Sequence, residues 1–179
     1  MDIEALKQLV RERIQGTRIG SDIPASEHSV RVYELLIKHE FPEEVAVAGL
    51  LHDILEDSDT TKEELKEKGV TERTIELVDL ASHDKSIKGS DARLMYILGR
   101  IIMARDNDAL AVKTADVLDN LRSCANMRPD RRQNMRLMKA PLIRNLAKGR
   151  VKDSLWNELN DEVREGYNAE GVTEMAEMP

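Results

Sequence analysis

With 179 residues, of which 41% are hydrophobic and 34% charged, the chain is long enough for one soluble globular domain with a full core. Its net charge of −7 argues against a partner that needs a basic face, such as a nucleic acid or a membrane surface. Cys124 is the only cysteine, and neither a signal-peptide profile nor an apolar run of transmembrane length is present, so we expect a cytoplasmic protein without disulfides.

Helical periodicity dominates the chain, and we expect an all-α fold of about eight or nine helices. Gly16 ends the first amphipathic segment, and a loop at 17–24 carries Arg18. Thr61, followed three residues later by Glu64, forms a capping-box pattern that opens a later helix. The expected helices span about 3–14, 26–37, 42–55, 61–69, 71–80, 91–104, 109–124, 130–147 and 152–165.

The chain divides into a helical domain, residues 1–166, and an acidic terminal segment, residues 167–179. The terminal segment contains few residues that could join a core, so we expect it to be frayed. No internal repeat and no glycine-rich phosphate loop is found in the helical domain.

The densest group of ionisable residues lies in His52-Asp53-Ile54-Leu55-Glu56-Asp57, directly after an apolar run. On a continuous helix its four ionisable side chains share one face, because side chains three or four positions apart are neighbours. Three carboxylates and an imidazole at the edge of a core are costly unless something compensates them, and a divalent metal is a common compensation. The segment therefore predicts a metal site. As an alternative, Glu56 and Asp57 could begin a solvated loop.

Further ligands for such a metal must come from other helices. His28, near the start of the second helix, and Asp116, inside an apolar stripe, are the candidates, and Asn120 lies one turn after Asp116. Two imidazoles and two carboxylates suit Mn²⁺, Fe²⁺ or Zn²⁺ and leave coordination positions open for water and substrate. His28 could instead be an ordinary helix-start residue.

Simpler interpretations exist for other members of this set. Asp116 could form a salt bridge with Lys113, which lies one turn away. A His-Asp dipeptide alone is weak evidence, and a second one, His83-Asp84, lies in a polar stretch where His83 is expected to be a helix-end or loop residue. His39, between two charged residues, is expected on the solvated surface.

The order of His28, His52-Asp53 and Asp116 resembles the HD-domain metal-dependent phosphohydrolases. Residues 51–61 are similar to the His-Asp-x-x-Glu-Asp-Thr signature of the RelA/SpoT-type alarmone hydrolases, and residues 112–122 resemble the Lys-x-Ala-Asp-x-x-x-Asn-x-Arg helix of that family. The resemblance covers about residues 10–150 and implies a single HD-domain helical bundle.

The resemblance also implies roles for individual residues. The implied ligands of a divalent metal, usually manganese, are His28, His52, Asp53 and Asp116. Glu56 and Asp57 match the acidic pair that positions or activates the attacking water, and Asn120 matches a residue that contacts the nucleotide near its 3′ group. Arg18 is similar to an arginine that stacks on the guanine base, but Ile19 stands where the family commonly has lysine. Candidates for the distal phosphates are Lys85, Lys88, Arg122, Arg136 and Arg144.

The activity implied is hydrolysis of the 3′-pyrophosphate of guanosine tetra- or pentaphosphate, a small-molecule nucleotide. A length of 179 residues leaves no room for the synthetase and regulatory domains of the bifunctional members, so the expectation is a stand-alone small alarmone hydrolase. Two alternatives stay open: an HD phosphohydrolase acting on another phosphorylated nucleotide, and a non-catalytic helical module that binds metal. The sequence does not indicate the oligomeric state.

Overall fold

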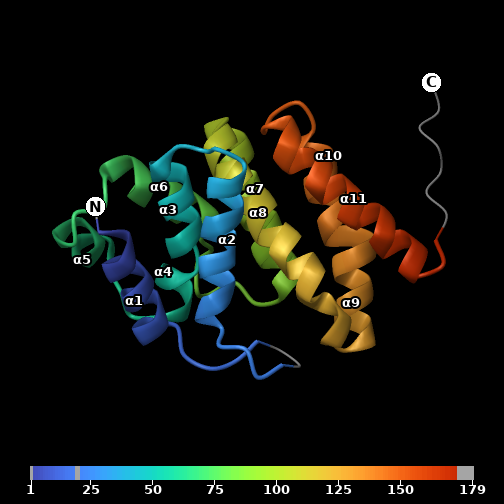
Figure 1. The fold of residues 1–179 in the computed structure, drawn as a ribbon, viewed down its shortest axis with the longest axis horizontal. Helices are drawn as coiled ribbons and strands as arrows, with labels where there is room; N and C mark the ends of the chain where they lie inside the picture. The colour runs from blue at the N-terminus through green and yellow to red at the C-terminus, as the bar shows by residue number, and fades with distance from the viewer. Residues whose placement is uncertain (1, 19–20, 173–179) are drawn as a thin grey trace.

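The structure, a computed structural model, describes residues 2–18 and 21–172 (Figure 1). These residues form eleven α-helical segments and no strand, which confirms the all-α prediction. A 3₁₀ turn, Cys124–Asn126, follows α8, and a π-helical turn, Met135–Lys139, joins α9 to α10. None of the described helices is long and apolar enough to span a bilayer. The segments are α1 (Ile3–Arg13), α2 (Ser26–Lys38), α3 (Glu43–Leu51), α4 (Ile54–Asp57), α5 (Lys62–Glu67), α6 (Glu72–Ala81), α7 (Ser90–Ala104), α8 (Asn107–Ser123), α9 (Pro129–Asn134), α10 (Ala140–Ala147) and α11 (Asp153–Ala169).

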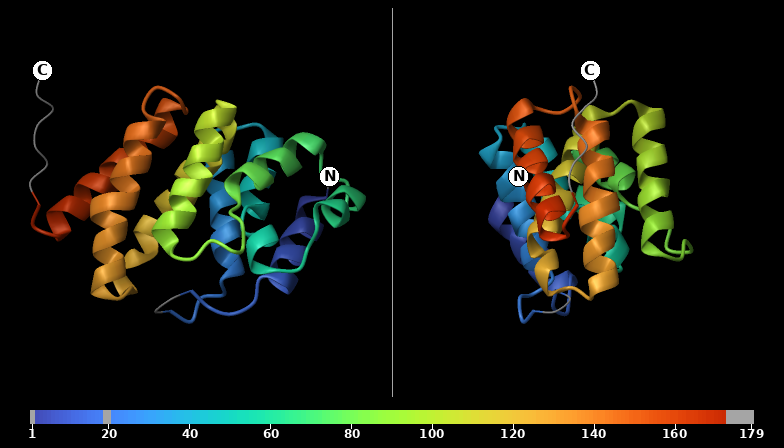
Figure 2. Two further views of the ribbon diagram at one scale, coloured as in Figure 1. Left: turned by 180° about the vertical axis from the view of Figure 1, so that it is seen from behind. Right: turned by 90° about the vertical axis from the view of Figure 1, so that its right-hand side faces the viewer.

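Helix α8 runs through the middle of the molecule, between α2, α3 and α6 on one side and the C-terminal helices α10 and α11 on the other (Figures 1 and 2). Every residue from Ala109 to Asp119 is buried except Lys113. A helix that is apolar around most of its circumference is stable only when other elements surround it. Asp116 and Asp119 of α8 therefore face the interior, where they need partners.

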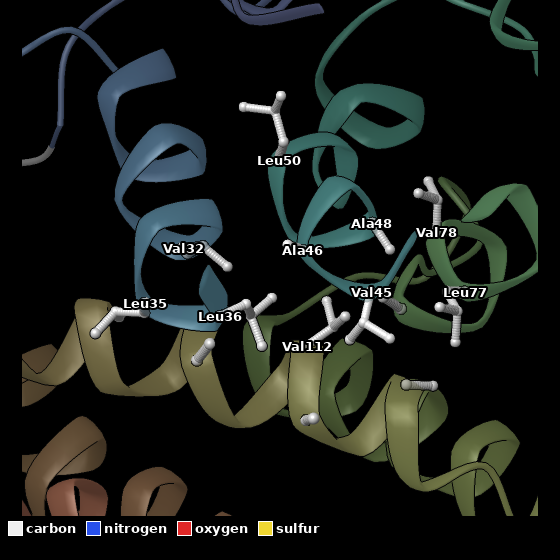
Figure 3. Packing of buried hydrophobic residues seen from close by; sticks show 14 of the residues in the cluster. Val32, Leu35, Leu36, Val45, Ala46, Ala48, Leu50, Leu77, Val78 and Val112 are labelled. Carbon is white, nitrogen blue, oxygen red and sulfur yellow. The ribbon is translucent and has the colours of Figure 1, made fainter. Parts of the chain in front are cut away.

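Helices α2 and α3 pack closely above α8. Figure 3 shows Val32 and Leu36 of α2 pointing toward Val45 of α3 and Val112 of α8. Gly49 permits the close approach, because a Cβ atom there would lie 2.5 Å from Cδ1 of Leu36 and 3.1 Å from Cγ1 of Val32. This contact places the end of α3, and with it His52, against α2.

Substituting Gly49→Ala is expected to lower the free energy of unfolding by up to about 2 kcal/mol, because overpacking costs about 1–3 kcal/mol and the gain in helix propensity offsets about 1 kcal/mol of that cost. Urea titration measures the change. Gly99→Ala in α7 is the matched control: nothing lies within 4 Å of the added Cβ, so propensity should stabilise this variant. A more stable Gly49→Ala protein would contradict the packing argument.

The predicted helix over 42–55 is wrong in one respect, since the structure interrupts it at His52 and Asp53. The imidazole Nδ1 of His52 lies 2.8 Å from the carbonyl oxygen of Gly49, the acceptor that the N–H of Asp53 uses in a continuous helix. The Asp53 carbonyl then accepts from the N–H groups of Glu56 and Asp57, which starts α4. The four ionisable side chains thus project from a junction and not from one continuous helix face.

The predicted helix over 130–147 is also interrupted, by the π-helical turn between α9 and α10. Pro141 explains the change, because proline lacks an N–H and its ring clashes with the carbonyl four residues earlier in a regular helix. The wider π turn accommodates the ring. If each interrupted pair counts as one helix, the described residues contain nine, within the predicted number.

Two surface expectations are corrected. His39 is buried, and its Nε2 lies 2.6 Å from Oε2 of Glu158 on α11, so a contact with a distant helix removes it from solvent. The frayed segment does not begin at residue 167, because α11 continues through Ala169 and Tyr167 packs against the core. Residues 173–179 of the predicted tail lie outside the described residues, and the domain division at residue 166 stays a prediction.

Candidate metal centre and active site

Four side chains meet where α2, α8 and the junction between α3 and α4 converge. Nε2 of His28 lies 3.0 Å from Oδ1 of Asp116 and 3.9 Å from Oδ2 of Asp53. Nε2 of His52 lies 3.1 Å from Oδ1 of Asp53 and 3.7 Å from Oδ1 of Asp116. Asp53 is partly exposed and the other three are buried, so the cluster opens to solvent at Asp53. All four residues predicted as ligands are therefore neighbours in space.

The hydrogen bonding of His52 fits a metal ligand. A carbonyl oxygen can only accept, so Nδ1 of His52 carries the proton that it shares with Gly49. Nε2 points into the cluster, where it is buried beside Oδ1 of Asp53 and Oδ1 of Asp116, and it forms no well-aligned hydrogen bond with a described residue. A buried nitrogen without an aligned hydrogen bond is costly, and a cation held between this nitrogen and the carboxylates would remove the cost. Ligand atoms of His28, His52 and Asp53 also lie within 4.8 Å of one another.

Further hydrogen bonds hold the side chains of the candidate ligands in place. Nδ1 of His28 lies 2.6 Å from Oδ2 of Asp119. Lys113 donates to Oδ2 of Asp116 at 2.6 Å, as the salt-bridge interpretation predicted, and Asn120 donates to Oδ1 at 2.5 Å. The salt bridge leaves Oδ1 of Asp116 facing the imidazoles, so it is compatible with a ligand role. Such outer contacts orient ligands and tune metal affinity.

The acidic pair lies on α4, one turn beyond Asp53. Oε1 of Glu56 accepts a hydrogen bond of 2.7 Å from the backbone N–H of His83 and lies 2.6 Å from Nδ1 of that residue. Burial and then the charge of Asp53 raise the pKa of Glu56, against the opposing contacts with His83. Partial burial and Asp53 raise the pKa of Asp57 as well. Carboxylates with raised pKa values beside a charged cluster are suited to proton transfer.

A cavity of about 550 Å³ lies between the loop that carries Arg18 and the end of α8. Nη2 of Arg18 donates to Oδ1 of Asn120 at 2.6 Å, so these two predicted substrate contacts lie side by side. The backbone N–H of Arg18 also bonds the carbonyl of Ile23, which closes the loop. Because the amide of Asn120 bonds both Arg18 and Asp116, it connects the cavity to the metal cluster.

The family model for the HD domain matches residues 7–147. The chain belongs to the HD domain family. Its relatives include proteins named guanosine-3′,5′-bis(diphosphate) 3′-pyrophosphohydrolase from Haemophilus influenzae, 29% identical over 86% of this chain, and from Vibrio cholerae, 30% identical over 86% of this chain. This HD domain covers 23% of the length of each of these two relatives, so it spans about a quarter of the curated proteins that it matches.

A solved structure described as a metazoan ortholog of SpoT that hydrolyses ppGpp superimposes with a TM-score of 0.78. It is 23% identical, and the match covers 95% of this chain and 96% of that one. At this identity the match shows the fold, and it confirms the predicted HD-domain helical bundle. An HD domain implies a divalent metal, and the His and Asp side chains of this one fit its binding.

The charges in this HD domain hold protons on the imidazoles when no metal is bound. Burial lowers the pKa of His52, but Asp53 and Asp116 raise it well above its usual range. Burial also lowers the pKa of His28, and hydrogen bonds to Asp116 and Asp119 raise it above the ordinary value. Against the effect of burial, the two histidines lower the pKa of Asp53 to about 2.

The affinity for Mn²⁺ is therefore expected to rise with pH. Each imidazole whose pKa is raised keeps its proton above about pH 6.5, and an ion must displace that proton to bind. Between about pH 6.5 and the raised pKa, the affinity should increase by about tenfold per pH unit for each proton displaced. Titration calorimetry in two buffers of different ionisation enthalpy measures the affinity and the protons released. A pH-independent affinity without proton release would contradict this.

The remaining predicted contact, Lys85, lies elsewhere in the HD domain. It is exposed, and its Nζ donates to the backbone carbonyl of Ser58 at 2.9 Å. Ser58 directly follows the acidic pair, so Lys85 lies beside the end of α4, and it does not line the cavity of Arg18 and Asn120. Of the other candidate cations, Arg122 lines that cavity but forms ion pairs with Glu158 and Glu162. Arg136 forms an ion pair with Glu170.

Three residues in the site were given no role by the sequence. His83 is a helix-end residue, as expected, but it also contacts Glu56. Asp119 contacts Nδ1 of His28, and Arg31 forms an ion pair with Asp119. Helical spacing could have indicated Asp119 and Arg31. Asp119 lies three residues after Asp116, and Arg31 lies three residues after His28, so each shares a helix face with a candidate ligand.

Proposed function

We propose that this HD domain is a cytoplasmic, manganese-dependent enzyme that hydrolyses the 3′-pyrophosphate of guanosine tetra- or pentaphosphate and releases pyrophosphate. The observation that carries the proposal is the position of Glu56 and Asp57, one turn from a cluster of two imidazoles and two carboxylates. A purely structural metal site has no use for an additional acidic pair. The names of the relatives support the same substrate.

His28, His52, Asp53 and Asp116 would hold the ion. A divalent ion bound there would lower the pKa of a coordinated water and neutralise charge on phosphoryl oxygens. Glu56 then takes the proton of the attacking water at Oε2, because Oε1 is engaged by His83. Asp57 orients the same water or keeps a proton for the leaving group, since two nearby carboxylates with raised pKa values ionise unequally.

The cavity residues would place the nucleotide. Arg18 has a planar guanidinium that stacks on a purine base, and its bond to Asn120 fixes its position at the mouth of the cluster. Asn120 contacts the substrate near the 3′ substituent, because its amide already bonds Asp116. Lys85, beside the acidic pair, contacts the distal phosphate of the leaving group.

A second candidate substrate is another phosphorylated nucleotide. No aromatic side chain of the described residues lines the cavity, and Ile19 follows Arg18 where the family commonly has lysine. Base selection would then depend largely on Arg18, which stacks on any purine.

The test is an assay of purified protein with Mn²⁺ and guanosine 3′,5′-bisdiphosphate, following pyrophosphate and guanosine 5′-diphosphate. A parallel panel contains adenosine and inosine analogues that carry phosphates at the 3′ and 5′ positions. Turnover of the guanosine compound above the others supports the proposal, and preferential turnover of another nucleotide supports the second candidate. Bound metal without turnover of any of these nucleotides would favour the non-catalytic module.

A further inference from the structure

A buried chain of contacts leads from the metal cluster to the wall of the cavity. Nδ1 of His28 lies 2.6 Å from Oδ2 of Asp119, on the side of the ring opposite to the cluster. Arg31 donates to both oxygens of the same carboxylate, from Nε to Oδ1 at 2.6 Å and from Nη2 to Oδ2 at 3.0 Å. Asp119 is buried, and Arg31 is one-third exposed and lines the cavity.

Asp119 determines how His28 faces the cluster. Its carboxylate accepts the Nδ1 proton, so the lone pair of the neutral ring is on Nε2, the atom 3.0 Å from Oδ1 of Asp116. The same contact fixes the plane of the ring. A carboxylate behind a ligating histidine also makes the ring a stronger base and therefore a better ligand.

Arg31 makes this arrangement possible. A buried carboxylate without a cationic partner is costly, and a bidentate guanidinium is the arrangement that best compensates it. The pair uses one edge of the guanidinium, Nε and Nη2. Nη1 has no hydrogen-bond or ion-pair partner among the described residues, and Arg31 lines the cavity that Arg18 and Asn120 share. The Nη1 donors are therefore available to an anion in that cavity.

We propose that Arg31 and Asp119 connect the nucleotide cavity to the metal centre: Asp119 positions His28 for the metal, and Arg31 holds Asp119 while donating from Nη1 to a phosphate of the nucleotide. Asp119 is a positioning residue, whereas Arg31 acts both as a positioning residue and as a contact to substrate. The second role rests on the proposed function, and the first requires only that the cluster binds a divalent metal.

The test compares Asp119→Ala, Asp119→Asn and Arg31→Gln with a matched control, Arg73→Gln. Arg73 forms a similar bidentate pair with Asp106, and its exposed fraction of 36% is close to the 34% of Arg31. Arg73→Gln therefore removes a comparable ion pair at a different place in the molecule. Mn²⁺ affinity is measured by titration calorimetry without nucleotide, kcat and KM by the pyrophosphate assay, and folding by thermal denaturation.

Asp119→Ala is expected to weaken Mn²⁺ binding by about 10–100-fold, and Asp119→Asn by less, because the amide oxygen still accepts the proton of His28. Arg31→Gln should weaken Mn²⁺ binding and raise KM by about tenfold or more, because a charge-assisted contact is lost. Arg73→Gln should leave both quantities unchanged.

Wild-type Mn²⁺ affinity in Asp119→Ala and Arg31→Gln overturns the positioning role. An unchanged KM in Arg31→Gln overturns the contact to phosphate. If Asp119→Ala does not fold, Asp119→Asn and Arg31→Gln still decide the matter, since both retain polar partners for the buried groups. Failure of the proposed function looks different: the wild-type protein then turns over no guanosine substrate, whereas the order of Mn²⁺ affinities among the variants is preserved.

Discussion

Replacing Asp53 with alanine is expected to abolish hydrolysis of guanosine 3′,5′-bisdiphosphate and the binding of Mn²⁺ together. Asp53 supplies the carboxylate that lies 3.1 Å from Nε2 of His52 and 3.9 Å from Nε2 of His28. Among the four proposed ligands, it is the one through which the cluster opens to solvent. Its removal leaves three candidate ligands. We expect the substitution to remove about 4 kcal/mol of transition-state stabilisation, which lowers kcat/KM by about a thousandfold.

The measurement pairs the pyrophosphate assay with calorimetric titration of Mn²⁺ on the same preparation. Asp59→Ala is the control, because Asp59 is highly exposed and pairs with Arg13 at the surface. It should retain the activity and metal affinity of the wild-type protein. An Asp53→Ala protein that hydrolyses the nucleotide at the wild-type rate contradicts the assignment of the cluster as the catalytic metal centre, whatever the affinity for Mn²⁺.

The sequence predicted most of the helices because their signals are local. Apolar periodicity indicates a buried face, and a capping residue marks where a helix begins. The side chain of Thr61, expected to cap a helix, accepts from the backbone N–H of Glu64, as the sequence indicated. Gly16, expected to end the first helical segment, has a positive φ angle of 89°. Such features depend on residues a few positions apart, so one sequence contains them in full.

The errors in the fold arise from contacts that the sequence does not show. Nothing adjacent to His39 indicates Glu158, its partly exposed partner 119 residues away on α11. The break between α3 and α4 depends on the rotamer of one side chain, since the imidazole of His52 takes the carbonyl of Gly49. Tyr167 looked like part of a frayed end until the packing of α11 against the core was known.

In the candidate site, too, the sequence predicts the local features and misses the long-range contacts. The chemistry of His52, Asp53, Glu56 and Asp57 is visible in a short segment, and His28 and Asp116 are candidates from the sequence because each could supply a ligand from another helix. The pairing behind these residues is not visible, because Asp119 contacts His28 across 91 residues. The packing of the helices determines which charged residues of a helix face inward. The sequence alone does not predict which residues these are.

Replacing Glu56 with glutamine is expected to lower kcat by about 10²–10⁴-fold while the Mn²⁺ affinity stays unchanged, because Glu56 acts on the proton of the attacking water and is not among the four proposed ligands. The same change should stabilise the metal-free protein. The folded-state pKa of Glu56 is raised above its ordinary value of 4.5, so the ionised carboxylate destabilises the fold as the pH rises through that window. At neutral pH, removing this charge should therefore increase stability, by on the order of 1 kcal/mol or about 2–4 °C in Tm.

The control, Glu64→Gln, should show the opposite pattern. Glu64 is 28% exposed and forms an ion pair of 2.8 Å with Arg13, outside the metal cluster. Losing that pair should cost about 0–1 kcal/mol and leave kcat unchanged. A Glu56→Gln protein that is less stable than wild type and fully active would mean that Glu56 is a structural partner of His83 and not a base. We therefore expect the Glu56→Gln protein to be less active and more stable than the wild type. This combination indicates that the fold retains an unfavourable charge because catalysis needs it. A carboxylate with a purely structural role would not be both destabilising and necessary for turnover.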